Sequence, residues 1–301
     1  MPALTSVTII WSPYHTGLRD LGVGDGPNKI RDAGLVSGLE AQGITVRQHT
    51  LSDVDDLTGE IGRSFGLLRQ VSTAVKRARS RDSFPLIIAG NCMTSVGVAC
   101  ALGPASLNYV AFDAHEDLHT PSTTTSGYFD GMGWSVLAGD SYQAMARTIP
   151  GFQAIELSKH LILCGTRDCT EIERKLIANY GVDTIWGSED GNDGAADALA
   201  RALRRKTNLP TLIHLDLDVL DDEVGKANAF AAPHGLSVAQ LKTCMRAVVG
   251  HGPVVGMTVA SFDPTAGSSD VIAAVAAEVV SEFVMTMIQR DELVGREESS
   301  A

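Results

Sequence analysis

The feature that most constrains the fold is an alternation, kept up along the whole chain, between short apolar runs and amphipathic segments. The apolar runs are rich in β-branched residues, which is typical of buried strands. We expect such strands at residues 6–11, 44–48, 85–90, 107–114, 160–166, 182–186, 211–218 and 254–263. Helical spacing occurs between them, at residues 27–43, 61–80, 171–181, 196–206, 237–250 and 270–290.

Strands that alternate with helices form a mostly parallel sheet that is covered by helices on both faces. The predicted fold class is therefore α/β, with a three-layer αβα arrangement around a sheet of about eight strands. No linker or change of composition divides the 301 residues. We expect a single domain over residues 1–295, followed by a disordered tail over residues 296–301.

The charge balance narrows the class of partner. The chain has 36 Asp+Glu against 24 Lys+Arg, a formal net charge of -12, whereas nucleic-acid binding needs clustered cations. A small cationic or zwitterionic ligand agrees with this balance, although an acidic surface also aids solubility. No apolar run approaches the roughly 20 residues that cross a bilayer, and the N-terminus lacks the basic start of a signal peptide. We therefore predict a cytoplasmic protein without a membrane partner, and its five cysteines are expected to be free thiols.

Polar residues stand where four of the predicted strands end, which is where ligands bind in parallel sheets. These residues are Asn91 and Cys92, then Asp113, His115 and Asp117, then Asp216, Asp218 and Asp221, and last Ser261 and Asp263. Alternate positions of an extended segment point to one side, so several carboxylates would share one crevice and repel one another. Divalent cations resolve that conflict.

Either acidic motif alone could be a solvated loop or a helix cap. Both together, in the same position on a parallel sheet, predict a metal site. Mixed carboxylate and imidazole ligands suit Mn, Fe, Zn or Ni better than Ca.

Three segments, DAHEDLHTP from Asp113, TTTSGYFDGM from Thr123 and LIHLDLDVLDD from Leu212, resemble the ureohydrolase family of binuclear manganese hydrolases (arginase, agmatinase and formiminoglutamase). The similarity is nearly full length, because SPYHTGLRDLGVGDGPNKIRDAGL resembles the opening of the family, and GTRDCTEIE and SFDPTAG fall where its later motifs do. The resemblance implies an arginase-like fold, a small-molecule substrate and a homo-oligomer, either a trimer or a hexamer.

The resemblance also implies two divalent metal ions, with manganese as the usual metal. The residues carried over as ligands are Cys92, Asp113, His115, Asp117, Asp216 and Asp218. Asp113 and Asp216 would bridge the ions, His115 and Asp218 would complete one site, and Asp117 would bind the other. Cys92 stands where the family has a histidine, and its thiolate would shift that site toward Zn or Fe. The alternative is a buried thiol beside a single metal that the other residues hold.

For the substrate, the resemblance implies contacts from His119, Thr124, Ser126, Tyr128, Thr170 and Ser261. Thr124 and Ser126 lie in HTPSTTTS, which is similar to the loop that binds the amino and carboxylate groups of an amino-acid substrate, although it could also be an ordinary surface loop. His119 and Tyr128 replace asparagines, and Thr170 replaces an aspartate.

Ser261 occupies the place of the family's guanidinium-binding carboxylate. A guanidinium prefers a bidentate carboxylate partner, and Asp263 or Asp130 could take that role. An ordinary arginase is therefore not expected.

Two metals about 3.5 to 4 Å apart lower the pKa of a bridging water. The resulting hydroxide would attack a trigonal carbon, and Asp216 or Asp221 would receive and pass the proton. Asp130 replaces the family's proton-shuttling histidine, and it could carry a proton, bind a cationic group or cap the next helix. His234 replaces a glycine, and it could be a proton carrier, an outer metal ligand or a hydrogen-bonded loop residue.

Our leading hypothesis is a metal-dependent hydrolase of a linear C–N bond in a guanidino, hydroxyguanidino, amidino or formimino group of a small amino-acid-like substrate. The alternative is a non-hydrolytic metal-binding member of the same fold with a regulatory or binding role. A third reading is a one-metal amidohydrolase similar to the deacetylase relatives of the fold.

Overall fold

The computed structural model describes residues 4–55 and 58–293. Its centre is an eight-stranded sheet in which every pair of neighbouring strands is parallel. In spatial order the strands are β4 (Val46–Thr50), β1 (Ser6–Ser12), β5 (Ser83–Ala89), β10 (Val254–Ala260), β9 (Thr211–Asp216), β6 (Asn108–Phe112), β7 (Leu161–Thr166) and β8 (Asp183–Trp186). All eight strands predicted from the sequence are therefore present. The predicted tail, residues 296–301, lies outside the described residues.

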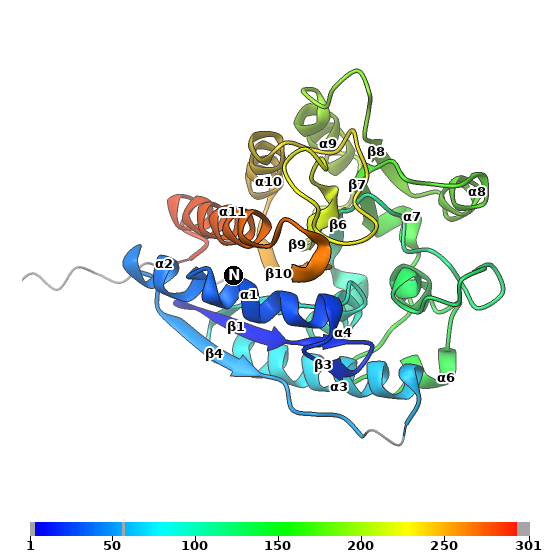
Figure 1. The fold of residues 1–301 in the computed structure, drawn as a ribbon, viewed down its shortest axis with the longest axis horizontal. Coiled ribbons are helices and arrows are strands. Elements are labelled where there is room, and N and C mark those ends of the chain that lie inside the picture. Colours follow the sequence, from blue (N-terminus) through cyan, green and yellow to red (C-terminus); the bar gives the residue numbers. More distant parts are fainter. Residues whose placement is uncertain (1–3, 56–57, 294–301) are drawn as a thin grey trace, which may run out of the picture.

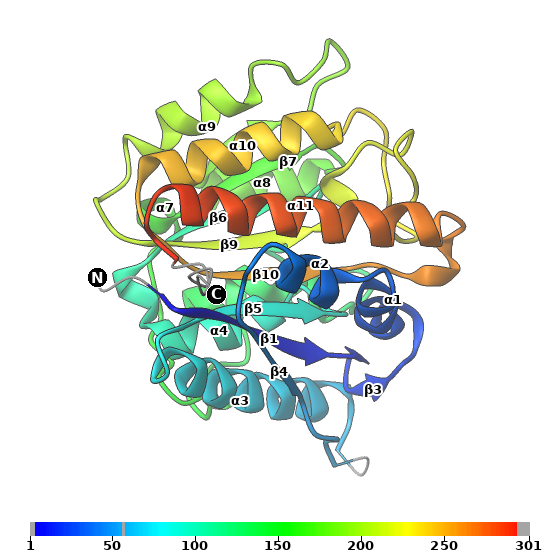
Figure 2. The ribbon, with the colours of Figure 1, turned by 90° about the vertical axis from the view of Figure 1, so that its left-hand side faces the viewer.

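Helices cover both faces of the sheet, as expected for three layers. Buried apolar side chains on one face pack against α1 (Gly26–Asp32), α2 (Leu35–Ala41), α9 (Ala195–Leu203), α10 (Val238–His251) and α11 (Ser269–Gln289). Those on the other face pack against α3 (Glu60–Arg79), α4 (Thr94–Leu102), α5 (Gly133–Ala138), α6 (Gln143–Ala146), α7 (Leu157–His160) and α8 (Glu171–Tyr180). In Figure 1, α1 and α3 lie on opposite sides of β1. Figure 2 shows α9, α10 and α11 side by side across the sheet.

Local chemistry sets several helix boundaries. The single helix expected over residues 27–43 is two helices, because Gly34 has a φ of +91°, a left-handed conformation that ends a helix and favours glycine. Capping boxes start α8 and α10, formed by Thr170 with Glu173 and by Ser237 with Gln240. Outside the main sheet, a short antiparallel pair, β2 (Tyr14–His15) and β3 (Leu18–Arg19), follows β1.

The last helix, α11, corrects one expectation. Its 21 residues are long and apolar enough to span a membrane by length and composition, whereas the sequence had been expected to contain no such run. Asp270, Glu278 and Glu282 interrupt the apolar stretch, so the sequence does not show it as one continuous run. Half of the most apolar 18-residue stretch of α11 is buried inside the protein. In the same helix, Glu282 contacts Lys242 of α10 at 2.8 Å. A core helix passes the same test, so this finding is weak support for a membrane span.

Candidate metal centre

The order of the strands brings the polar strand ends together. β5, β10, β9 and β6 are consecutive neighbours in the sheet, and they precede the four polar segments found in the sequence. Their ends are level, because Ala260 lies opposite Asp216, and Phe112 lies opposite Leu215. A parallel sheet therefore delivers all four segments to one edge.

The first close group of donors consists of Cys92, Asp113, His214 and Asp216. One ligand atom from each residue lies within 4.8 Å of those from the other three, and all four residues are buried. Cys92 Sγ is 2.8 Å from Asp216 Oδ2. Burial and the surrounding carboxylates raise the pKa of the Cys92 thiol well above its usual value, so a thiolate here requires a bound cation.

The second group consists of Asp113, His115 and Asp218, again with donor atoms within 4.8 Å of one another. His115 Nδ1 is 3.3 Å from Asp218 Oδ2 and 3.5 Å from Asp113 Oδ1. Asp113 thus belongs to both groups, as a bridging carboxylate would.

The electrostatics of these groups fit divalent cations. Burial raises the pKa of Asp113 to about 6, and burial with the charges of Asp218 and Asp113 raises the pKa of Asp216 well above its usual value. Burial opposes charge on His115, but the carboxylates around it outweigh burial and raise its pKa. Burial likewise opposes charge on Asp218, but His115 and hydrogen bonds outweigh it and lower its pKa. A single imidazolium leaves this set short of positive charge, and metal ions would supply it.

Asp117 lies beside these groups without joining either. It lines the same cavity, and its backbone has a φ of 51°. Burial and the charges of Asp113 and Asp130 raise its pKa well above the usual value. Its predicted role as a metal ligand stays a prediction.

Four of these donors, Cys92, His115, Asp216 and Asp218, line a cavity of about 200 Å³. The described residues that line it are Val23, Cys92, His115, Glu116, Asp117, His119, Ser126, Tyr128, Asp130, Gly131, Glu173, Asp216, Asp218, Phe230 and Ser261. The predicted substrate residues His119, Ser126, Tyr128 and Ser261 are therefore at the cavity. Tyr128 and Phe230 form an aromatic pair there, with ring centroids 6.0 Å apart.

Asp130 holds the segment that carries Cys92. Its carboxylate accepts hydrogen bonds from Asn91 Nδ2 at 2.7 Å and from the backbone N–H groups of Met93 and Cys92 at 2.8 and 3.1 Å. These groups lead into α4, so they do not support the helix-cap alternative for Asp130, which placed it before the helix that follows it. The sequence reasoning missed the partner because it is about 40 positions away. The predicted role of Asp130 as a proton carrier stays a prediction.

Four of the predicted substrate-binding and catalytic residues are not among the described residues that line the cavity: Thr124, Thr170, Asp221 and His234. The hydroxyl of Thr170 instead accepts the N–H of Glu173 in the capping box of α8, and that of Thr124 accepts the N–H of Gly127.

Asp221 and His234 lie in the loops near the end of β9. The Asp221 carboxylate accepts the N–H groups of Gly235 and Glu223 at 2.8 and 2.9 Å. His234 is exposed, has a φ of 65° and lies 3.9 Å from Glu189. These contacts fit loop-stabilising residues, and the catalytic roles predicted for both stay predictions.

Ser261 has a φ of 67°, and both its backbone and its side chain are held by Asn228. Asn228 Nδ2 contacts Ser261 Oγ at 3.0 Å and Ser261 O at 2.9 Å, and it also donates to Asp218 Oδ2 at 3.1 Å. Asp263, considered above as a replacement carboxylate, accepts the N–H and hydroxyl of Thr265. It is not among the described residues of the cavity lining.

Sequence reasoning missed several residues of this site. Glu116 is buried in the cavity wall, and Glu173 contacts His119 at 3.0 Å between Oε1 and Nε2. The T-x-x-E pattern that ends at Glu173 and the position of Glu116 between two predicted ligands were available signals. His214 carried no such signal, because it lies inside a strand that reads as core.

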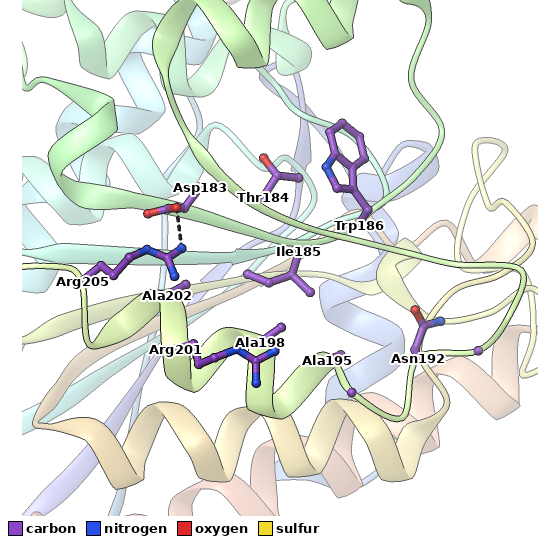
Figure 3. Close-up of a pocket in the computed structure, with 12 residues that line it drawn as sticks. Asp183, Thr184, Ile185, Trp186, Asn192, Ala195, Ala198, Arg201, Ala202 and Arg205 are labelled. Carbon is purple, nitrogen blue, oxygen red and sulfur yellow. Dashed lines mark hydrogen bonds and ion pairs between the residues drawn. The ribbon is translucent and has the colours of Figure 1, made fainter.

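A larger hollow, of about 400 Å³, lies at one edge of the sheet, between β8 and α9. We call it the edge hollow; it is lined by Asp183, Thr184, Ile185, Trp186, Gly191, Asn192, Gly194, Ala195, Ala198, Arg201, Ala202 and Arg205. Figure 3 shows Arg205 reaching Asp183, with the two side chains 2.7 Å apart. The described residues of its lining include no close group of metal donors.

Fold and site together define an α/β protein with metal-binding groups at the carboxyl ends of its central strands. The model of the Arginase family matches residues 5–286. Arginase-1 of Xenopus laevis is 28% identical over 250 residues, which cover 76% of this chain and 78% of that protein. Arginase of Staphylococcus aureus (strain COL) is 26% identical over 240 residues, which cover 73% and 76%.

The crystal structure of arginase from Bacillus subtilis superposes with a TM-score of 0.81 at 22% identity, over 93% of this chain and 98% of the other. The chain belongs to the arginase family. This confirms the family and the fold class predicted from the sequence.

Proposed function

We propose that the chain is a metal-dependent hydrolase that cleaves a linear C–N bond in a guanidino, hydroxyguanidino, amidino or formimino group of a small amino-acid-like substrate. The observation that carries this proposal is the pair of donor groups that share Asp113 at the cavity. Membership of the arginase family supports the same reaction class. The cytoplasmic location and the trimer or hexamer stay predictions.

The inner metal would be held by Cys92, Asp113 and Asp216, with Asp117 beside it, and the outer metal by Asp113 with His115 and Asp218. When bound, two divalent ions supply a Lewis acid and lower the pKa of a bound water toward neutrality. The thiol of Cys92 favours Zn or Fe at the inner site, while manganese suits the outer site, whose donors are carboxylates and an imidazole.

The chain's own residues would select and orient the substrate. Glu116, Asp117 and Glu173 place carboxylates in the cavity wall, and Tyr128 and Phe230 supply aromatic surface. Such a lining favours a cationic ligand.

At the end of β10, Ser261 can only offer a hydroxyl to a guanidinium. The Asp130 carboxylate is already engaged by three N–H donors. A guanidino group would therefore lack a bidentate carboxylate partner at these two positions, which argues for a substrate other than arginine.

The test is a substrate panel on protein that has been stripped of metal and reloaded with Mn²⁺ or Zn²⁺. Arginine, N-hydroxyarginine, agmatine and formiminoglutamate would be compared by chromatography of the released urea, hydroxyurea or formamide. We expect release with at least one substrate, loss of that release in Asp218→Asn, and retention in the matched control Asp183→Asn in the edge hollow. Tight metal binding with no release above the Asp218→Asn background would favour the non-hydrolytic alternative.

A further inference from the structure

His214 is a buried histidine that neither the predicted metal ligands nor the predicted catalytic residues include. It lies on β9 two residues before Asp216, so both side chains point to the same side of the strand. Its side chain is enclosed, with the residue 1% exposed. The ring of Trp134 packs edge-on against it, with ring centroids 6.2 Å apart.

The two ring nitrogens of His214 have different surroundings. Nδ1 lies 2.7 Å from Oγ1 of Thr258, the residue directly opposite on β10. Nε2 is buried and has no hydrogen-bond partner among the described residues. A buried polar group without a partner destabilises the folded state, and a ligand bound at Nε2 would remove that cost.

His214 also belongs to a close group of possible metal ligands. The close group that contains His214 also contains Cys92, Asp113 and Asp216, with one ligand atom of each within 4.8 Å of the others. A histidine that binds metal through one nitrogen usually has the other held by a hydrogen bond. Thr258 provides such a contact for Nδ1.

We propose that Nε2 of His214 is the fourth ligand of the inner metal, together with Cys92, Asp113 and Asp216. This rests on the proposed function, because it completes one of its two metal sites. The donor set is then one thiolate, one imidazole and two carboxylates. Four ligands of this kind suit Zn²⁺ better than Mn²⁺. Asp117, which is outside the group, is the competing fourth ligand.

The experiment uses Co²⁺ as the probe, added to chelator-treated full-length protein and followed by absorption spectroscopy. We expect a thiolate-to-cobalt band in the near ultraviolet that Cys92→Ser abolishes. In His214→Gln that band should remain, while the visible d–d bands change and the affinity of the inner site falls at least about 10-fold. Asp117→Asn should change the visible bands less than His214→Gln does.

Two further variants keep the proposal testable if His214→Gln does not fold. Thr258→Val retains the imidazole but removes its partner, and it should weaken the inner site about 10- to 100-fold. His160→Gln is the matched control, because His160 bonds a backbone carbonyl, Leu107 O at 2.7 Å, away from the cavity. It should leave the cobalt spectrum as in the wild type.

Unchanged bands and affinity in folded His214→Gln would overturn the proposal, and so would unchanged affinity in Thr258→Val if only that variant folds. His214 would then be a core imidazole. The hydrolysis panel separates this result from the proposed function. If the cobalt spectra respond as expected but no product is released from any substrate, His214 is a ligand of the inner metal and the proposed hydrolase function is wrong. Failure of Co²⁺ to bind the wild type would overturn both.

Discussion

The two hollows of this molecule differ in how their charges are balanced. The edge hollow is about 400 Å³, twice the volume of the cavity at the centre of the sheet, yet its acid is already neutralised. Asp183 contacts Arg205 at 2.7 Å and Lys206 at 3.1 Å, and these contacts lower its pKa although partial burial opposes them. In the central cavity the carboxylates outnumber the cations. Unbalanced buried charge therefore identifies the chemical site better than volume does.

The topology of the sheet explains this difference. The central cavity lies where β5, β10, β9 and β6 end side by side, so four strands place their first loop residues together. The edge hollow borders β8, the last strand of the sheet, and only one strand contributes to it. A parallel sheet concentrates polar groups at the first place and not at the second.

The largest expected effect comes from replacing a carboxylate of the central cavity. Replacing a carboxylate of the edge hollow serves as the control. Asp218→Asn removes a ligand of the proposed outer metal and the partner of His115, and we expect the affinity for that metal to fall about 100-fold or more. Elemental analysis after dialysis should show at least one metal fewer per chain than in wild type. The control Asp183→Asn should keep the full metal content. Equal metal content in both variants would break the comparison between the hollows.

The second comparison concerns two arginines. The guanidinium of Arg167 donates to six backbone carbonyls, those of Gly165, Asp218, Val219, Leu220, Ala232 and Pro233. Arg167→Met leaves several of these acceptors unpaired, so the free energy of unfolding should fall by about 3–5 kcal/mol in urea titrations.

Arg201 is exposed in the edge hollow, and Arg201→Met should change the free energy of unfolding by less than about 0.5 kcal/mol. Similar losses in the two variants would mean that Arg167 does not organise the loops around the central cavity.

The third prediction concerns the buried carboxylate of Glu116 in the central cavity and the pH dependence of the free energy of unfolding. Burial, and next the charge of Glu173, raises the pKa of Glu116 from 4.5 to about 7. The folded protein therefore holds this proton longer than the unfolded chain does, and its free energy of unfolding falls as pH rises from about 4.5 to 7. In metal-free protein, Glu116→Gln should remove this loss, gaining up to about 3 kcal/mol at pH 8 and nothing below pH 4.

Urea unfolding of the two proteins across this pH range measures the effect. The exposed Glu171, which pairs with Lys175, provides the control: Glu171→Gln should change the free energy of unfolding by less than about 1 kcal/mol at every pH. If the free energy of unfolding depended on pH in the same way in wild type and in Glu116→Gln, burial would not raise the pKa of Glu116.

The fold was predictable because it depends on pattern. Eight apolar runs separated by amphipathic segments predict a parallel sheet. Acidic residues at alternate positions after two of these runs predict a metal site at the edge where the strands end. Asp113 and Asp218 were found in this way, and the structure brings their carboxylates around His115. Both steps need only local sequence and the rule that parallel strands end at one edge.

What could not be predicted depends on contacts between distant segments. His214 reads as one more core position of a strand. Its unpaired Nε2 and its membership of a close donor group with Cys92 appear only in the structure. Capping of its own segment was one of three roles considered for Asp130, but its hydrogen-bond partners precede α4. Glu173 reaches His119 from the first turn of α8. A single sequence carries no period or spacing that reports such pairings.

The smallest expected effect tests the edge hollow by itself. Arg205 is 59% exposed at its side chain, and it shares Asp183 with Lys206, whose side chain is 3% exposed. Arg205→Gln should lower the free energy of unfolding by only about 0.2–1 kcal/mol, because an exposed ion pair gains little over solvation. The loss should shrink further in 0.5 M salt, where exposed charges are screened. If Arg205→Gln lowered the free energy of unfolding by more than about 2 kcal/mol, and salt did not reduce this loss, the edge hollow would also hold charge that solvent does not balance. Charge balance would then no longer distinguish the edge hollow from the central cavity.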